Sequence, residues 1–279
     1  MPIHDQGYRR YGGGRTPRGG AWAVIASAGI RAMLAQRVFL GLLLIAWFPF
    51  FARVLQIYAA VNLPQAAILA PTPETFREFL EQQGIFVFFV TVYAGAGLIA
   101  NDRRANALQI YLSKPLTRGE YVFGKLAILM SFLLLVTWVP AIVLLIVQVL
   151  LAGNFTFFRH HVYLFPAITV FSFLQVIMVS TAMLALSSLS RSSRYVGILY
   201  AALIFFSQAL YGVLTFVTGG SAISWMSFPA NLTQVGNAIF RLPPRYETPW
   251  PLSLLMIVAL IATSGIVLER RVRGVEVVV

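Results

Sequence analysis

Few residues of this chain are able to take part in chemistry, and they lie outside its apolar blocks. All nine acidic residues and all three histidines fall in segments between or beside these blocks, and the chain has no cysteine. Proton-driven carriers usually relay protons through intramembrane Asp, Glu or His. An intramembrane hydrolase needs a base beside its nucleophile. The sequence offers neither arrangement, so we expect no catalytic residue and no enzyme activity in this chain.

A metal site is also not expected. His160 and His161 are adjacent in the sequence, but neighbouring residues do not share a helix face. A zinc site needs three or four ligands, and no third ligand lies nearby in the sequence.

Residues 119–126, GEYVFGKL, nearly match the phosphate-binding loop G-x-x-x-x-G-K-[ST]. Leu126 replaces the hydroxyl residue that binds magnesium, and Glu120 would repel a phosphate. The segment also leads into an apolar block, whereas a phosphate-binding loop follows a buried strand. We therefore expect no nucleotide binding, no cofactor and no ATP hydrolysis in this chain.

The elements that position these groups are membrane spans. The chain of 279 residues is 59% apolar and only 11% charged, with a mean hydropathy of +0.80, whereas soluble domains carry roughly 25% charged residues. A span needs about 20 apolar residues, and long uninterrupted blocks favour a helical bundle over a barrel. The sequence predicts an all-α membrane protein with six transmembrane helices, at about 38–59, 84–100, 123–152, 163–187, 195–217 and 251–268.

The distribution of basic residues predicts the orientation. With six spans and both termini on one side, sixteen basic residues share that side: Arg9, Arg10, Arg15, Arg18, Arg31, Arg37, Arg103, Arg104, Lys114, Arg118, Lys125, Arg191, Arg194, Arg270, Arg271 and Arg273. Five do not: Arg53, Arg77, Arg159, Arg241 and Arg245. The positive-inside rule then places both termini and residues 101–125 in the cytoplasm. We expect the chain to lie in the inner membrane of the cell. The net charge of +12 belongs to topology and anionic lipid, not to nucleic acid.

Shorter segments flank the spans. Residues 1–20 are rich in Gly and Arg and predict a disordered basic tail without a cleavable signal peptide, before one six-span membrane domain at 21–279. Residues 21–37 predict an interfacial helix, or else an extension of the first span. Residues 72–80 predict a short outer helix. Residues 218–250 are rich in proline and aromatic residues and predict one or two short interfacial helices.

Polar groups inside the spans suggest a substrate path. Gln208, Tyr211 and Thr215 recur on one face of the fifth block together with Gly212, and Arg53 lies in the first block. Polar side chains in a span turn toward protein or water. They are therefore either a substrate path or contacts that hold helices together, and Arg53 is also able to reach the outer headgroups.

The long polar stretch at 101–125 has a helical pattern of its own. Leu108, Tyr111 and Leu112 are spaced i, i+3, i+4, which places three large apolar groups on one face of a short helix at 105–113. Charged residues flank this helix, and Pro115 follows it. The spacing predicts a rigid cytoplasmic helix with an apolar docking face.

This stretch resembles the inner loop of ATP-binding-cassette (ABC) permeases of the type 2 exporter family. The resemblance covers about 25 residues and rests on Asp102-Arg103-Arg104, Ala107-Leu108-Gln109, Tyr111-Leu112-Ser113, Pro115-Leu116, Thr117-Arg118 and Tyr121…Gly124-Lys125. It implies that the loop is a coupling helix that docks into a groove of the ATPase. The implied contact residues are Asp102, Arg103, Arg104, Leu108, Tyr111, Leu112, Lys114 and Arg118.

The same resemblance implies the partners. ATP and Mg²⁺ would bind to a separate cytoplasmic ATPase subunit, present in two copies, and a second permease copy would complete the transporter. Family members often have Glu at the position of Asp102 and Gly-Thr near Asn106-Ala107.

Two other functions stay open at this point. In the first, an ABC permease of this kind transmits ATPase motion to an extracytoplasmic partner, with residues 218–250 as the output surface. A secondary carrier that uses backbone carbonyls and hydroxyls is the other alternative. The sequence has no charged binding constellation, so the substrate stays unnamed: lipid-like, hydrophobic and polymeric cargoes all fit.

Overall fold

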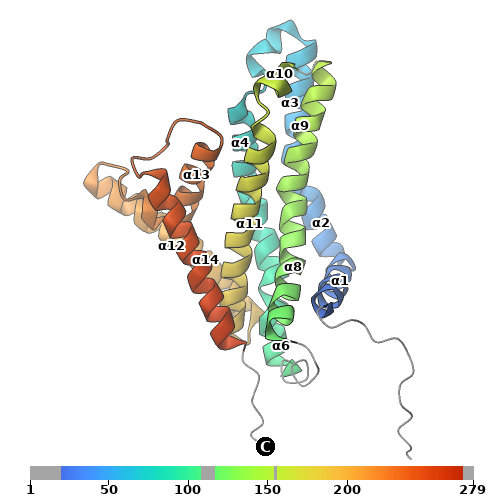
Figure 1. Cartoon of the computed structure of the whole chain (residues 1–279), viewed down its shortest axis with the longest axis vertical. Coiled ribbons are helices and arrows are strands. Elements are labelled where there is room, and N and C mark those ends of the chain that lie inside the picture. Colours follow the sequence, from blue (N-terminus) through green and yellow to red (C-terminus); the bar gives the residue numbers. More distant parts are fainter. Residues whose placement is uncertain (1–19, 108–116, 154–155, 273–279) are drawn as a thin grey trace, which may run out of the picture.

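The computed structural model describes residues 20–107, 117–153 and 156–272, and every regular element in these ranges is helical. The helices form an elongated bundle (Figure 1). Six helical segments are long and apolar enough to cross a membrane: Arg37–Asn62, Pro73–Arg104, Arg118–Ala152, Leu164–Leu189, Ser193–Thr218 and Trp250–Arg271. Five of the six expected spans lie wholly within these segments, and the fourth, 163–187, begins one residue before Leu164. The agreement confirms a multi-pass all-α membrane protein.

The first and third spans are each broken once. They consist of α2 (Arg37–Ala46) with α3 (Phe48–Asn62), and of α8 (Arg118–Val136) with α9 (Trp138–Ala152). Pro49 and Pro140 lie in the first turn of the second helix of each pair. Proline lacks an N–H and clashes with the preceding turn, so both breaks have a local cause.

The second span begins with the predicted outer helix. Thr72 and Thr75 form a reciprocal cap at the start of α4, and Pro73 occupies its first turn. The chain continues through four segments: α4 (Pro73–Gln82), α5 (Gly84–Val90), the π-helix η2 (Thr91–Gly95) and α6 (Gly97–Arg104). The outer helix and the span therefore form one long helical segment that contains a π-bulge. Such bulges are often found at functional sites.

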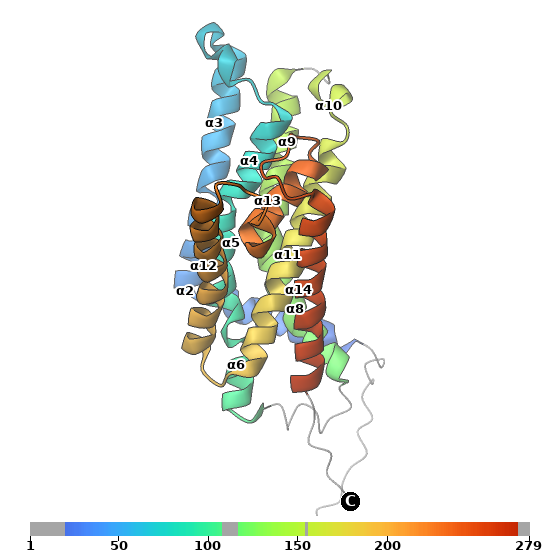
Figure 2. The ribbon, with the colours of Figure 1, turned by 90° about the vertical axis from the view of Figure 1, so that its left-hand side faces the viewer.

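The N-terminal helix α1 (Ala21–Leu34) packs against α8 and runs across the long helices (Figure 2). Trp22 meets Phe123 edge to face, with ring centroids 5.3 Å apart. Glycines on both helices allow this close crossing: a Cβ at Gly29 would lie 2.2 Å from Ile128 Cδ1, and one at Gly124 would lie 2.9 Å from Ile25 Cβ. This confirms a separate helix at 21–34 rather than a continuous extension of the first span.

The fourth span, α11 (Leu164–Leu189), is the most buried of the six. It contacts α6, α8, α9, α12, α13 and α14. The remaining elements are η1 (Pro64–Leu69), α10 (Thr156–His160), α12 (Ser193–Thr218), η3 (Ser224–Met226), α13 (Phe228–Ile239) and α14 (Trp250–Arg271). In Figure 1, α12, α13 and α14 stand together beside α11.

The segment between the last two spans contains α13, but it is not a surface helix. α13 packs against α11, α12 and α14, and Asn231, Gln234 and Gly236 on it are buried. The Gln234 amide donates to the carbonyls of Tyr246 and Thr248 at 3.0 and 2.7 Å. The expected short helix is therefore present. It packs inside the bundle, where Gly236 is buried and the Gln234 amide has hydrogen-bond partners.

The bundle has two distinct ends. Both ends of the segment 105–117 and the end of α14 lie together at one end (Figure 1), which we call the loop end. We call the opposite end, where α3, α4, α9 and α10 lie, the far end.

Candidate functional site at the loop end

The start of α8 is fixed by a capping box. Thr117 Oγ1 accepts from the Glu120 backbone N–H at 3.2 Å, and the Glu120 carboxylate accepts from the Thr117 N–H at 3.0 Å. Thr-x-x-Glu before an apolar run is the usual sequence of this cap, so the sequence contained the signal. Glu120 therefore belongs to a helix start.

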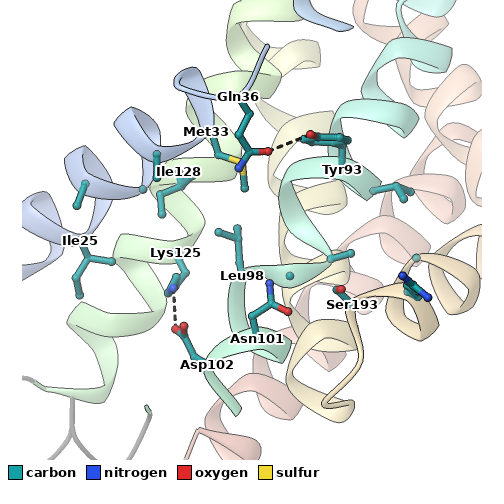
Figure 3. Close-up of a pocket in the computed structure, with 18 of the residues that line it drawn as sticks. Ile25, Met33, Gln36, Tyr93, Leu98, Asn101, Asp102, Lys125, Ile128 and Ser193 are labelled. Carbon is teal, nitrogen blue, oxygen red and sulfur yellow. Dashed lines mark hydrogen bonds and ion pairs between the residues drawn. The ribbon is translucent and has the colours of Figure 1, made fainter. Parts of the chain in front are cut away.

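An ion pair links the two helices that flank the segment. Lys125 Nζ on α8 lies 2.7 Å from Asp102 Oδ2 on α6, and the Tyr121 hydroxyl donates to the same oxygen at 2.7 Å. The Lys125 and Asp102 side chains are only 14% and 18% exposed. Charge-assisted hydrogen bonds that are shielded from water are strong, so this cluster clamps α6 to α8 (Figure 3).

A serine of α11 holds the start of α6. The Ser187 hydroxyl accepts from the N–H groups of Ile99 and Ala100 at 3.1 and 3.0 Å, and donates to the Ala96 carbonyl at 2.9 Å. These groups directly follow the π-helix, where the regular helical hydrogen bonding is disturbed. Ser187 is fully buried, so the contact joins the loop-end half of the second span to the centre of the bundle.

The predicted coupling residues fall into three groups. Asp102 is in the clamp, and the Arg103 guanidinium donates to the carbonyl of Ser188. Arg104 and Arg118 are exposed at the two ends of the segment. Four others lie outside the described residues: Leu108, Tyr111, Leu112 and Lys114.

Asn106 adopts a left-handed backbone with a φ of 52°. Glycine takes this conformation at little cost, and asparagine is among the few other residues that tolerate it. The resemblance to the permease family had suggested Gly-Thr near this position. Asn106 therefore adopts the same left-handed backbone conformation that a glycine at this position would allow.

A cavity of about 1080 Å³ lies beside the clamp, between α1, η2, α6, α8 and α12. Its walls include Ile25, Leu98 and Ile128, whereas Asn101 and the Asp102–Lys125 pair provide polar groups (Figure 3). The volume is ample for a small molecule. No sequence pattern indicated this cavity, because its walls come from four separate segments.

We expect the Asp102–Lys125 pair to couple energetically. Asp102→Leu or Lys125→Leu alone leaves a shielded charge without its partner, which should cost about 1–3 kcal/mol of stability. The double variant removes both charges and should recover part of this loss. Thermal unfolding of the four proteins in a neutral detergent measures the coupling. Additive effects of the two changes would show that the pair is not a clamp.

The candidate path residues of the fifth span face α13 and the segment after it. Gln208 Oε1 accepts from the Ser227 hydroxyl at 2.5 Å, and the ring of Tyr211 meets Tyr246 edge to face at 5.8 Å. Thr215 Oγ1 is buried and has no hydrogen-bond partner. All three residues lie on α12, and Gln208 and Tyr211 contact residues on either side of α13: Ser227 directly before it and Tyr246 after it.

Arg53 lies apart from that stripe. Its guanidinium donates to Gln56 Oε1 at 2.9 Å and to Glu78 Oε2 at 3.1 Å. Arg53 thus links α3 to α4 near the far end. It does not line the cavity beside the clamp, and it lies apart from the Gln208–Thr215 stripe on α12.

A comparison with known families identifies the chain. The family model described as ABC-2 family transporter protein matches residues 23–247. The chain belongs to the ABC-2 transporter family. No curated protein matches it. The match runs from α1 to the segment before α14, so it covers the clamp and most of the bundle. Family membership confirms the resemblance and makes this chain an ABC permease subunit, a membrane transport component.

Proposed function

We propose that this ABC-2 permease is an exporter subunit driven by a separate cytoplasmic ATPase. The observation that supports this most is the clamp at the loop end. Asp102 and Lys125 tie together the two helices that enter and leave residues 105–117. A segment held at both ends transmits a push to the spans, whereas a loose loop would absorb it. The basic residues at this end support a cytoplasmic location, in the inner membrane of the cell.

The proposed mechanism passes force along named contacts. An ATPase that moves residues 105–117 also moves α6 and α8, because the ion pair joins them. Ser187 carries the motion of α6 to α11, and the close α1–α8 crossing carries that of α8 to α1. These helices, except α11, form walls of the cavity beside the clamp, so its shape would follow the ATPase cycle.

We propose this cavity as the loop-end part of the substrate path. α12 supplies one wall through Ser193, Gly197 and Ile198, and it carries the Gln208–Thr215 stripe farther along. A second permease copy and two ATPase copies would complete the transporter. ATP and Mg²⁺ would be bound by the ATPase.

Purification from native membranes tests the proposal. A tagged chain should bring down an ABC ATPase, and the complex should hydrolyse ATP in a vanadate-sensitive manner. Absence of any ATPase would support a secondary carrier instead. An ATPase without net substrate movement in proteoliposomes would support an output to an extracytoplasmic partner.

A further inference from the structure

A second cavity, of about 230 Å³, lies in the part of the bundle away from the loop end. It is enclosed by α4, α5, α11, α12 and α13, and most of its walls are apolar, including Leu80, Val179 and Ile204. Arg77 and Gln175 interrupt this lining. Both side chains are buried, at 3% and 6% exposure, and a buried ionisable residue in a membrane bundle usually marks a functional site.

The Arg77 guanidinium has fewer partners than its five N–H groups allow. Nη2 donates to the Thr233 carbonyl at a long 3.4 Å, and Nη1 lies 3.8 Å from the Glu81 carboxylate. One face covers the Phe171 ring at 4.8 Å. Neither Nε nor Nη1 has a hydrogen-bond acceptor. Buried N–H groups of a charged side chain are costly when unpaired.

The charges around Arg77 do not balance. Glu81 is shared, because its other oxygen pairs with Arg245 at 3.0 Å. Burial raises the pKa of Tyr246, the nearby phenol, so this group stays neutral and adds no negative charge. Two arginines thus face one carboxylate, which leaves room for one more anion.

Gln175 adds a second unmet polar atom in the same cavity. Its Oε1 accepts no hydrogen bond, although the side chain lies on the cavity wall. A bound group with a hydroxyl or a protonated oxygen would satisfy it. The cavity therefore offers a cation, an acceptor and apolar walls within one space.

We propose that this cavity binds the anionic head of an amphiphile, a phosphate or carboxylate carried on an alkyl chain. The head would lie at Arg77, and the first carbons would lie along the apolar walls. Phe88 lines both this cavity and the one beside the clamp, so the two cavities are neighbours in the bundle. The proposal names a ligand class for the transport function above, but binding can be measured without any ATPase.

Binding of decyl phosphate to the full chain in a neutral maltoside detergent tests the proposal. Decyl phosphate should bind, whereas decanol and inorganic phosphate should each bind at least about tenfold more weakly. Arg77→Gln should weaken decyl phosphate binding about tenfold or more, since a charge-assisted hydrogen bond is lost. Arg159→Gln is the control, because this arginine is exposed on α10 and lies outside the cavity lining.

A glycine variant tests the cavity without touching Arg77. Gly84 lines the cavity, and a Cβ there would meet no atom within 4 Å, so a leucine adds side-chain volume at the cavity wall without a clash at its Cβ. Gly84→Leu should keep the fold and weaken decyl phosphate binding. The matched control is Gly41→Leu, at an equally open helical glycine that lines neither cavity.

Three results would overturn the proposal. The first is unchanged decyl phosphate affinity in a folded Arg77→Gln variant, and the second is unchanged affinity in Gly84→Leu. The third is an equal affinity for decanol, which would show that the anionic head is not needed for binding, or for inorganic phosphate, which would show that the alkyl chain is not needed. Failure of these tests leaves the ATPase-driven function intact, and failure of the pull-down leaves this site intact.

Discussion

Replacing Leu108 with glutamate is expected to reduce substrate-stimulated ATPase activity about 100-fold or more. Leu108 belongs to the predicted apolar face with Tyr111 and Leu112, and we propose that this face docks into the ATPase. A carboxylate placed in an apolar groove loses its hydration without a partner, which costs several kcal/mol. Because residues 108–116 are outside the described structure, this prediction rests on sequence spacing and on the clamp at both ends of the segment.

A matched variant separates docking from a general charge effect. Ser113→Glu adds the same charge on the opposite face of the predicted helix and should keep most of the stimulated activity. Both variants should reach the membrane in wild-type amounts, since neither residue lies in a span. Comparable activity in Leu108→Glu and wild-type complexes would rule out the proposed docking face.

The spans were predictable because they depend on local composition. A membrane span needs only a run of apolar residues of sufficient length, so each expected block falls, to within one residue, inside an observed helical segment of membrane length. Pro49 and Pro140 also acted locally, through their missing N–H groups. The clamp was different. Asp102 and Lys125 were visible in the sequence as charged residues. Their pairing, however, depends on how α6 and α8 lie relative to each other in the fold.

The near match to a phosphate-binding loop at residues 119–126 also shows that a sequence pattern does not reveal which contacts its residues make in the fold. Glu120 caps α8 and Lys125 pairs with Asp102. Gly124 lets α1 approach, because a Cβ there would lie 3.0 Å from the Trp22 carbonyl oxygen. Three separate packing roles thus produce one sequence pattern. The capping box was readable from the sequence, whereas the other two roles depend on helices that meet only in the fold.

Arg77 was beyond sequence reasoning for a related reason. Its partner carbonyl on Thr233 is 156 positions away in the chain. The sequence placed Arg77 in a short outer helix, where an exposed arginine would be unremarkable. Its burial depends on α13 lying inside the bundle, and the proline-rich composition of residues 218–250 had suggested a surface location.

Gly124→Val is expected to separate α1 from α8 and to abolish transport. A side chain at Gly124 would collide with Ile25 Cβ and with the Trp22 carbonyl oxygen, at 2.9 and 3.0 Å. Backbone cannot move aside cheaply, so overpacking should cost about 1–3 kcal/mol of stability. α1 is also one wall of the cavity beside the clamp, and its displacement would open that wall.

A crosslink measures this displacement directly, because the chain has no native cysteine. A Cβ at Gly29 would lie within 3.7 Å of Ile128 side-chain carbons, so cysteines at these two positions are close enough for a disulfide. The crosslink should form in an otherwise wild-type chain and fail with Gly124→Val. Gly119→Val on the same helix meets no atom within 4 Å and should leave the crosslink unchanged. Efficient crosslinking in Gly124→Val would mean that α8 tolerates the side chain and that the glycine is not needed for the crossing.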